Sequence, residues 1–311
     1  MASVRKYRVL IVDDSELMRH FLQQILKSHA ELEVVGTAED PYQAREKVKL
    51  LNPDVLTLDI EMPKMNGISF LRNLMRLRPM PVVMISTLTE KGAPETLTAL
   101  ELGALDYIAK PTTTDISKLT DYAAEVCQKV VNAAKSKEAM LRMLASDKQI
   151  GAAKHAHKVT PAVVFKPGYI VAMGASTGGT EAIKRVVRDL PANMPPIVIT
   201  QHIPAMFATS FAKRLDAMCE MTVYEAKDMQ KIETGCIYLA PGDRHMSVEK
   251  KAGDYYCRLH DSEPVNRHKP SVEVLFNSIA QLGTTQAIGL MLTGMGADGA
   301  QALLNMRLAG Q

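Results

Sequence analysis

Short apolar runs alternate with longer amphipathic stretches through the first 135 residues of this 311-residue chain. The amphipathic stretches, such as residues 15–27 and 41–51, repeat their apolar positions with helical spacing. The apolar runs have the composition of buried strands and occupy residues 8–12, 33–35, 55–58, 82–85 and 107–109. Strands that alternate with helices predict a parallel sheet with helices on both faces. We therefore expect an α/β fold that begins with an N-terminal (βα)5 domain.

A second α/β region begins near residue 168. Runs at residues 169–173, 196–200 and 287–292 predict further buried strands. Residues 221–259 have a pattern rich in strands, interrupted by turn-forming sequences that contain Gly242 and Gly253. These features predict a C-terminal doubly wound parallel sheet with a β-rich insertion.

Residues 136–165 differ from both regions, because they contain no strand-like run and carry five basic side chains against Glu138 and Asp147. Their net charge of +3 equals the net charge of the whole chain. A solvated basic linker explains this segment better than nucleic-acid binding does, since the remainder of the chain is electrically balanced. We expect domains at residues 1–135 and 168–311, joined by a linker at residues 136–167.

The composition excludes several other classes of protein. Apolar residues make up 47% of the chain, as in globular proteins, but no apolar run approaches the roughly 18–20 residues that span a bilayer. The N-terminus lacks the apolar segment of a signal peptide. The cysteines form no Cys-x-x-Cys motif, and such scattered cysteines are typical of free thiols in a reducing compartment: Cys127, Cys219, Cys236 and Cys257. We expect a cytoplasmic protein that inserts into no membrane and binds no nucleic acid.

Three carboxylates follow the first and third predicted strands. Asp13 and Asp14 come directly after the first strand, and Asp59 comes after the third. Because the carboxyl ends of parallel strands meet at one edge of a sheet, these side chains can converge. An oxygen-only ligand set suits Mg²⁺. Ser86 ends the fourth strand and Lys110 follows the fifth, where a hydroxyl and an ammonium group can bind phosphoryl oxygens.

These residues belong to a set of motifs that resembles the receiver domain of response regulators. The motifs are Val12-Asp13-Asp14-Ser15, Leu58 to Gly67 with Glu61 inside it, Ser86, and Lys110-Pro111. The resemblance implies that Asp59 accepts a phosphoryl group in a Mg²⁺-dependent reaction. By the same resemblance Asp14 binds the metal directly and Asp13 binds it through water, while Glu61 lends its backbone carbonyl. Ser86 and Lys110 are the implied switch residues.

A glycine-rich turn from Gly174 to Thr180 follows a predicted strand and opens a predicted helix. Such a turn suits either a nucleotide phosphate or a nucleophilic serine. The dinucleotide alternative is disfavoured, because Thr180 stands where its last glycine belongs and no acidic residue follows the next strand. Ser176 is therefore a candidate nucleophile.

Two further strand ends supply the partners that a nucleophilic serine needs. His202 follows the next strand, and Asp298 lies in a glycine-flanked loop after the last strand. The histidine can take the serine proton, and the carboxylate can orient the imidazole. Asp298 could alternatively cap a helix that begins near Ala300. The chain order of serine, histidine and acid differs from that of ordinary α/β-hydrolases, in which the acid precedes the histidine.

The C-terminal region resembles the catalytic domain of the chemotaxis protein-glutamate methylesterase/protein-glutamine glutaminase (CheB) family. The motifs that carry this resemblance are Met173 to Thr180, Gln201 to Pro204, Leu239 to Met246, Asn266 to Val272 and Leu292 to Gly299. The resemblance implies a catalytic triad of Ser176, His202 and Asp298. It also implies that the backbone N–H groups of Thr177 and Met295 form the oxyanion hole.

Other histidines are alternative candidates for the general base. His245, His260 and His268 rank below His202 in that role. We expect His268 and the neighbouring Arg267 near the substrate groove instead.

Together the resemblances imply a phosphorylation-activated serine hydrolase that demethylates glutamate methyl esters, releasing methanol, and deamidates glutamines on chemoreceptors for chemotactic adaptation. A chemotaxis histidine kinase is the implied phosphodonor, and ester hydrolysis is expected to need no cofactor. The family continues for a few dozen residues beyond the position of Gln311, so we expect a C-terminal domain without a terminal strand and helix. The alternative is a receiver fused to a non-catalytic interaction domain.

Overall fold

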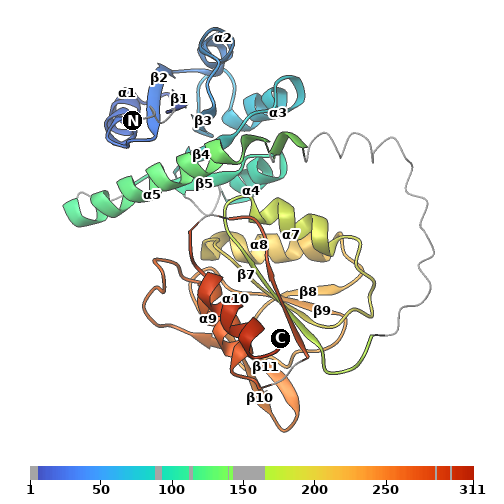
Figure 1. Ribbon diagram of the computed structural model, residues 1–311. Helices are drawn as coiled ribbons and strands as arrows, with labels where there is room; N and C mark the ends of the chain where they lie inside the picture. The colour runs from blue at the N-terminus through green and yellow to red at the C-terminus, as the bar shows by residue number, and fades with distance from the viewer. Residues whose placement is uncertain are drawn as a thin grey trace. The chain divides into compact units, whose positions relative to one another are not determined.

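The computed structural model describes residues 6–87, 93–111, 115–138, 140–142, 165–283, 286–294 and 296–311. The chain divides into two compact units, Met1–Val159 and Thr160–Gln311. Each unit is built around its own parallel sheet (Figure 1).

The N-terminal unit contains a five-stranded parallel sheet with strand order β2-β1-β3-β4-β5. Its strands are β1 (Tyr7–Val12), β2 (Leu32–Ala38), β3 (Val55–Leu58), β4 (Val82–Ser86) and β5 (Asp106–Ala109). Its helices are α1 (Glu16–Lys27), α2 (Pro41–Leu51), α3 (Gly67–Leu77), α4 (Ala93–Glu101) and α5 (Ile116–Lys135). The expected (βα)5 domain is confirmed. Because β1 and β3 are neighbours, the residues that follow them lie together at the carboxyl edge of the sheet.

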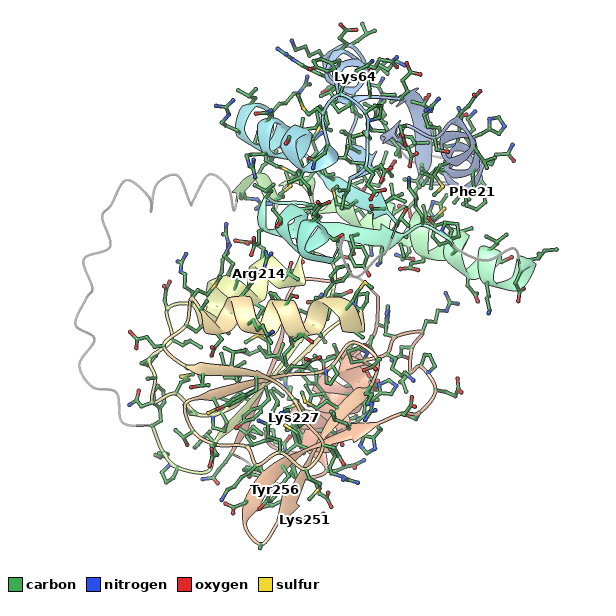
Figure 2. The ribbon with its side chains drawn as sticks, turned by 180° about the vertical axis from the view of Figure 1, so that it is seen from behind. Phe21, Lys64, Arg214, Lys227, Lys251 and Tyr256 are labelled. Carbon is green, nitrogen blue, oxygen red and sulfur yellow. The ribbon has the colours of Figure 1, made fainter. Side chains whose placement is uncertain are left out.

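Local sequence explains where two of these helices begin. Ser15 caps α1 by accepting a hydrogen bond from the backbone N–H of Met18. Asp40 caps α2 in the same way, and Pro41 occupies the first helical turn, where no backbone N–H partner is needed. Phe21 of α1 (labelled in Figure 2) stacks on Tyr122 of α5 with ring centroids 6.1 Å apart, so these two helices cover one face of the sheet together.

The residues directly after α5 still contact the N-terminal unit. Lys137 Nζ lies 3.2 Å from Asp54 Oδ1, and Met140 is buried. The remainder of the predicted linker, from residue 143 to residue 164, lies outside the described residues.

The C-terminal unit contains a five-stranded parallel sheet with strand order β12-β6-β7-β9-β8 and a separate antiparallel hairpin. Its strands are β6 (Ile170–Ala175), β7 (Ile197–Gln201), β8 (Thr222–Glu225), β9 (Cys236–Leu239), β10 (His245–Lys251), β11 (Asp254–His260) and β12 (Ala287–Met291). Its helices are α7 (Gly179–Val187), α8 (Ala205–Asp216), α9 (Val272–Ala280) and α10 (Ala300–Leu308). The expected doubly wound sheet is confirmed. Within the segment expected to be a β-rich insertion, β8 and β9 instead extend the main sheet, and β10 and β11 form the separate hairpin.

Helices cover both faces of this second sheet. Helices α9 and α10 pack on one face around a core that includes Phe276 and Met306, and Figure 1 shows α7 and α8 on the opposite side. The hairpin of β10 and β11 packs against α9 through Met246 and Val248, while Lys251 and Tyr256 mark its outer part in Figure 2. Strand β12 forms one edge of the sheet, where Ile288 is 46% exposed.

All four cysteines are free, as the sequence predicts. Within the described residues, no helix is both long enough and apolar enough to cross a bilayer.

Candidate active site

Ser176 lies directly beyond β6, at the start of the turn that leads into α7. Its backbone N–H donates to Thr293 O at 2.9 Å, which joins this turn to the loop after β12. That loop approaches very closely, because a Cβ atom on Gly294 would lie 2.8 Å from the Cβ of Ser176. Glycine at position 294 therefore lets the nucleophile turn and the loop that carries Asp298 meet.

His202 lies between the serine and the acid. Its Nδ1 is 2.9 Å from Ser176 Oγ, and its Nε2 is 2.8 Å from Asp298 Oδ2. Because an ionised carboxylate only accepts hydrogen bonds, Nε2 carries a proton and the neutral ring offers Nδ1 as the acceptor for the serine hydroxyl. The structure thus brings together all three members of the predicted triad, at the ends of three neighbouring strands.

The side chain of Asp298 is almost completely buried and accepts hydrogen bonds from several groups. Ser271 Oγ donates to Oδ1 at 2.6 Å and Asn266 Nδ2 donates to the same oxygen at 3.0 Å, while Val272 N donates to Oδ2 at 2.7 Å. Burial raises the pKa of the Asp298 carboxyl, but the hydrogen bonds from His202, Ser271, Asn266 and Val272 outweigh it and hold the pKa well below its ordinary value. The carboxylate therefore stays ionised and can stabilise an imidazolium.

The capping role that the sequence allowed for Asp298 is also present, but at a different helix. The N-cap residue of α9, Ser271, makes no capping hydrogen bond of its own. Asp298 accepts from the first two backbone N–H groups of that helix, those of Val272 and Glu273. The positive end of α9 thus adds to the stabilisation of the negative charge.

The three alternative bases lie in different environments. His245 is fully buried, with Ser271 N donating to its Nδ1 and its Nε2 3.0 Å from Glu263 O, so it supports the loop beside the site. His260 lies on the hairpin, 2.6 Å from Ser247 Oγ. His268 stacks on His202 with ring centroids 3.7 Å apart and planes inclined by 13°. Of the three, His268 is the one in contact with the triad.

Of the two predicted oxyanion donors, Thr177 directly follows the nucleophile in sequence. Thr177 is buried, and its carbonyl accepts a hydrogen bond from Thr293 Oγ1 at 3.1 Å. Met295 lies outside the described residues. The oxyanion role of both backbone N–H groups therefore stays a prediction.

A second group of charged side chains lies at the carboxyl edge of the N-terminal sheet. Lys110 Nζ is 2.6 Å from Asp59 Oδ2 and 2.9 Å from Asp13 Oδ2, and both carboxylates are almost fully buried. Burial is the largest effect on both acids and raises the pKa of Asp59 to about 6, while that of Asp13 also rises despite Lys110. The two buried carboxyl groups share a single ammonium group, so the cluster carries a net negative charge when both are ionised.

The donor set at this edge fits a divalent cation. Asp13, Asp14 and Asp59 each place a carboxylate oxygen within 4.8 Å of the others. Three carboxylates with one exposed member suit Mg²⁺, which binds oxygen and retains several waters. The chain can pack tightly behind Asp59, because a Cβ atom on Gly67 would lie 1.9 Å from the Asp59 carbonyl oxygen.

The remaining predicted residues of this group lie close by. Ser86 is buried at the end of β4, and its carbonyl accepts a hydrogen bond from Lys110 N at 2.9 Å. Glu61 is exposed two residues after Asp59. Their roles as a switch hydroxyl and a carbonyl ligand remain predictions.

The fold and the two sites define a class of protein, a serine hydrolase joined to a receiver domain. The family described as CheB methylesterase matches residues 171–311, and the response regulator receiver domain matches residues 9–124.

Similarity to whole proteins spans both domains. The chain is 55% identical over 307 residues to the protein-glutamate methylesterase/protein-glutamine glutaminase 2 of Saccharophagus degradans, covering 99% of this chain and 87% of that protein. It is 50% identical to the corresponding protein of Hydrogenovibrio crunogenus, covering 98% of this chain and 88% of that one. The Salmonella typhimurium protein of the same name is 47% identical, with 98% and 85% covered. The chain belongs to the protein-glutamate methylesterase/protein-glutamine glutaminase family.

Sequence reasoning assigned no role to several residues that the structure brings to the hydrolase site. Asn266 and Ser271 both contact Asp298, and they lie within the segment from Asn266 to Val272, which points to a role only through the family resemblance. Gln201 contacts the backbone of both Ser176 and His202. Its position directly before His202 is the sequence feature that could have indicated a role at this site.

Proposed function

We propose that Ser176, His202 and Asp298 are the catalytic triad with which this enzyme hydrolyses glutamate methyl esters and deamidates glutamines on chemoreceptors. One observation carries the proposal: a continuous chain of contacts in which His202 lies 2.9 Å from Ser176 Oγ and 2.8 Å from Asp298 Oδ2. An interaction domain without catalysis has no need for this arrangement.

The reaction proceeds in two halves. Ser176 Oγ attacks the side-chain ester carbonyl as its proton passes to His202 Nδ1, and Asp298 stabilises the imidazolium through Nε2–H. His202 then gives the proton to the departing oxygen, which leaves as methanol, and a glutamyl ester remains on Ser176. Water attacks that ester with His202 again as the base, so the products are a glutamate carboxylate and free Ser176. With a glutamine substrate, ammonia leaves in place of methanol.

The oxygen of the tetrahedral intermediate needs donors beside the nucleophile. We assign this role to the backbone N–H groups of Thr177 and Met295. The positive end of α7, which begins at Gly179, supports a negative charge at the same place.

The receiver regulates the hydrolase. Asp59 accepts a phosphoryl group from a histidine kinase, and Asp13, Asp14, Asp59 and the Glu61 carbonyl would hold the Mg²⁺ ion that this reaction needs. When bound, this ion neutralises the charge that develops on the transferred phosphoryl group. Lys110 and Ser86 bind phosphoryl oxygens, and their movement transmits the phosphorylation of Asp59 to the surface of the domain.

The decisive test is methanol release from methylated chemoreceptor membranes, with and without a small-molecule phosphodonor. We expect release from the parent enzyme that increases with the phosphodonor. A folded protein that binds these membranes and releases no methanol under either condition would contradict the proposal.

A further inference from the structure

The last residue of β7, Gln201, lies beside the residue that precedes the nucleophile. In the parallel register of β6 and β7, Ala175 pairs with Gln201, so Ser176 and His202 are the next residues of the two strands. The backbone N–H of His202 donates to Ala175 O at 3.2 Å. Beyond this point neither residue belongs to a strand, so other contacts must fix their relative positions.

The side chain of Gln201 makes two such contacts. Its Nε2 donates to Ser176 O at 2.9 Å and to His202 O at 3.1 Å. One amide group therefore joins the backbone of the nucleophile to the backbone of the base. Only this orientation of the amide works, because exchanging its nitrogen and oxygen would place three oxygens together.

The surroundings are shaped to hold the amide there. Gln201 is 4% exposed, and a Cβ atom on Gly179 would lie 1.9 Å from its Oε1. Any residue larger than glycine at position 179 would displace the amide. Oε1 itself has no hydrogen-bond partner in the described part of the chain.

We propose that Gln201 is a positioning residue of the hydrolase, whose amide fixes the distance between the Ser176 hydroxyl and the His202 ring. The inference rests on the proposed triad. Because the Gln201 side chain is buried and its Nε2 donates to backbone carbonyls, we expect it to act on the chemical step and to leave substrate binding unchanged.

The test compares full-length variants on methylated chemoreceptor membranes. Gln201→Met keeps the length of the side chain and removes both donors, and we expect kcat to fall about 10- to 100-fold with KM unchanged. Gln201→Glu places a carboxylate against the two carbonyl oxygens at neutral pH. Protonation restores one donor, so the ratio of its kcat to that of the parent should rise as the pH is lowered.

Thr200→Val is the matched control, because Thr200 is the preceding residue of the same strand, is fully buried, and has a hydroxyl without a partner in the described residues. We expect it to keep the parent kcat. A fluorophosphonate that labels Ser176 counts the competent sites, so each rate is expressed per active site.

Three results would overturn the positioning role. The first is a folded Gln201→Met variant with the parent kcat. The second is a loss of rate that disappears when rates are expressed per active site. The third is an equal loss in Thr200→Val. If the proposed triad is wrong, activity will survive in Ser176→Ala. This variant therefore distinguishes failure of the triad from failure of the positioning role.

Discussion

His202 faces the Ser176 hydroxyl with Nδ1 rather than Nε2, at 2.9 Å from Oγ. Nε2 lies on the other side of the ring, 2.8 Å from Asp298 Oδ2. This is the reverse of the arrangement in chymotrypsin-like proteases, where Nε2 faces the serine. A 180° rotation of the ring about χ2 would put Cδ2 in the place of Nδ1 and Cε1 in the place of Nε2, so it would remove both contacts and would not interchange the two nitrogens.

Removing either the nucleophile or the base should abolish ester hydrolysis. We expect Ser176→Ala and His202→Ala each to lower kcat by about 10⁴-fold or more, since members of a triad act as a unit. Methanol release measures the effect, and circular dichroism checks that both variants fold. Substantial activity in both folded variants would favour the interaction-domain alternative.

Asp298 should make the C-terminal unit sensitive to acid. Its folded pKa lies below its ordinary value of 3.8, so its contribution to the free energy of unfolding is present above that pH and is lost as the pH falls further. We expect Asp298→Asn to lower kcat by about 10⁴-fold at neutral pH. In chemical denaturation, the stability difference between parent and Asp298→Asn should narrow below about pH 4. A constant difference from pH 7 to pH 3 would contradict the ionised, hydrogen-bonded state.

The stacked ring of His268 should hold His202 in place. Because ring stacking is worth about 0.5–1.5 kcal/mol, we expect His268→Ala to lower kcat about 2- to 10-fold. His268→Phe retains a ring and should keep most of the activity. Equal losses in the two variants would show that the imidazole acts through its nitrogens instead of through stacking.

Divalent metal should matter for the receiver and not for ester hydrolysis. We expect phosphorylation of Asp59 to require Mg²⁺ and to weaken strongly in Asp13→Asn, because that change removes a charge from the cluster of three carboxylates. Phosphorylation is followed with a labelled small-molecule phosphodonor. In a variant without residues 1–134, EDTA should leave methanol release unchanged, and loss of activity there would contradict a serine mechanism that needs no metal.

The receiver should restrain the hydrolase until it is phosphorylated. We expect Asp59→Asn to stay at the low basal rate whether or not phosphodonor is present. Deleting residues 1–134 should raise the basal rate by about 5- to 150-fold, the usual range for coupling between two sites. If the folded deletion variant were as slow as the unphosphorylated parent, activation would have to come from direct contact or from recruitment to receptors.

The fold class of this protein and the location of its two sites can be predicted from the sequence alone. Apolar runs such as Val9–Val12 and Ile197–Thr200 are buried on both faces, so they form parallel strands wherever helices cover them. Parallel strands end at one edge, and that rule places Asp13 near Asp59, and Ser176 near His202, before any coordinates are known. The fold class and both groups of candidate residues follow from this local pattern.

The tertiary structure decided what depends on contacts between distant segments. The helix that Asp298 caps begins at Val272, 26 residues earlier, and no local signal distinguishes it from the helix at Ala300. Strands β8 and β9 join the main sheet because their pairing partners are set by packing rather than by their own residues. The choice of Nδ1 on His202 and the two bonds of Gln201 depend on the register of β6 against β7 and on side-chain rotamers. Sequence periodicity specifies which residues face the core, but orientation at a site is fixed only when the surrounding side chains are packed.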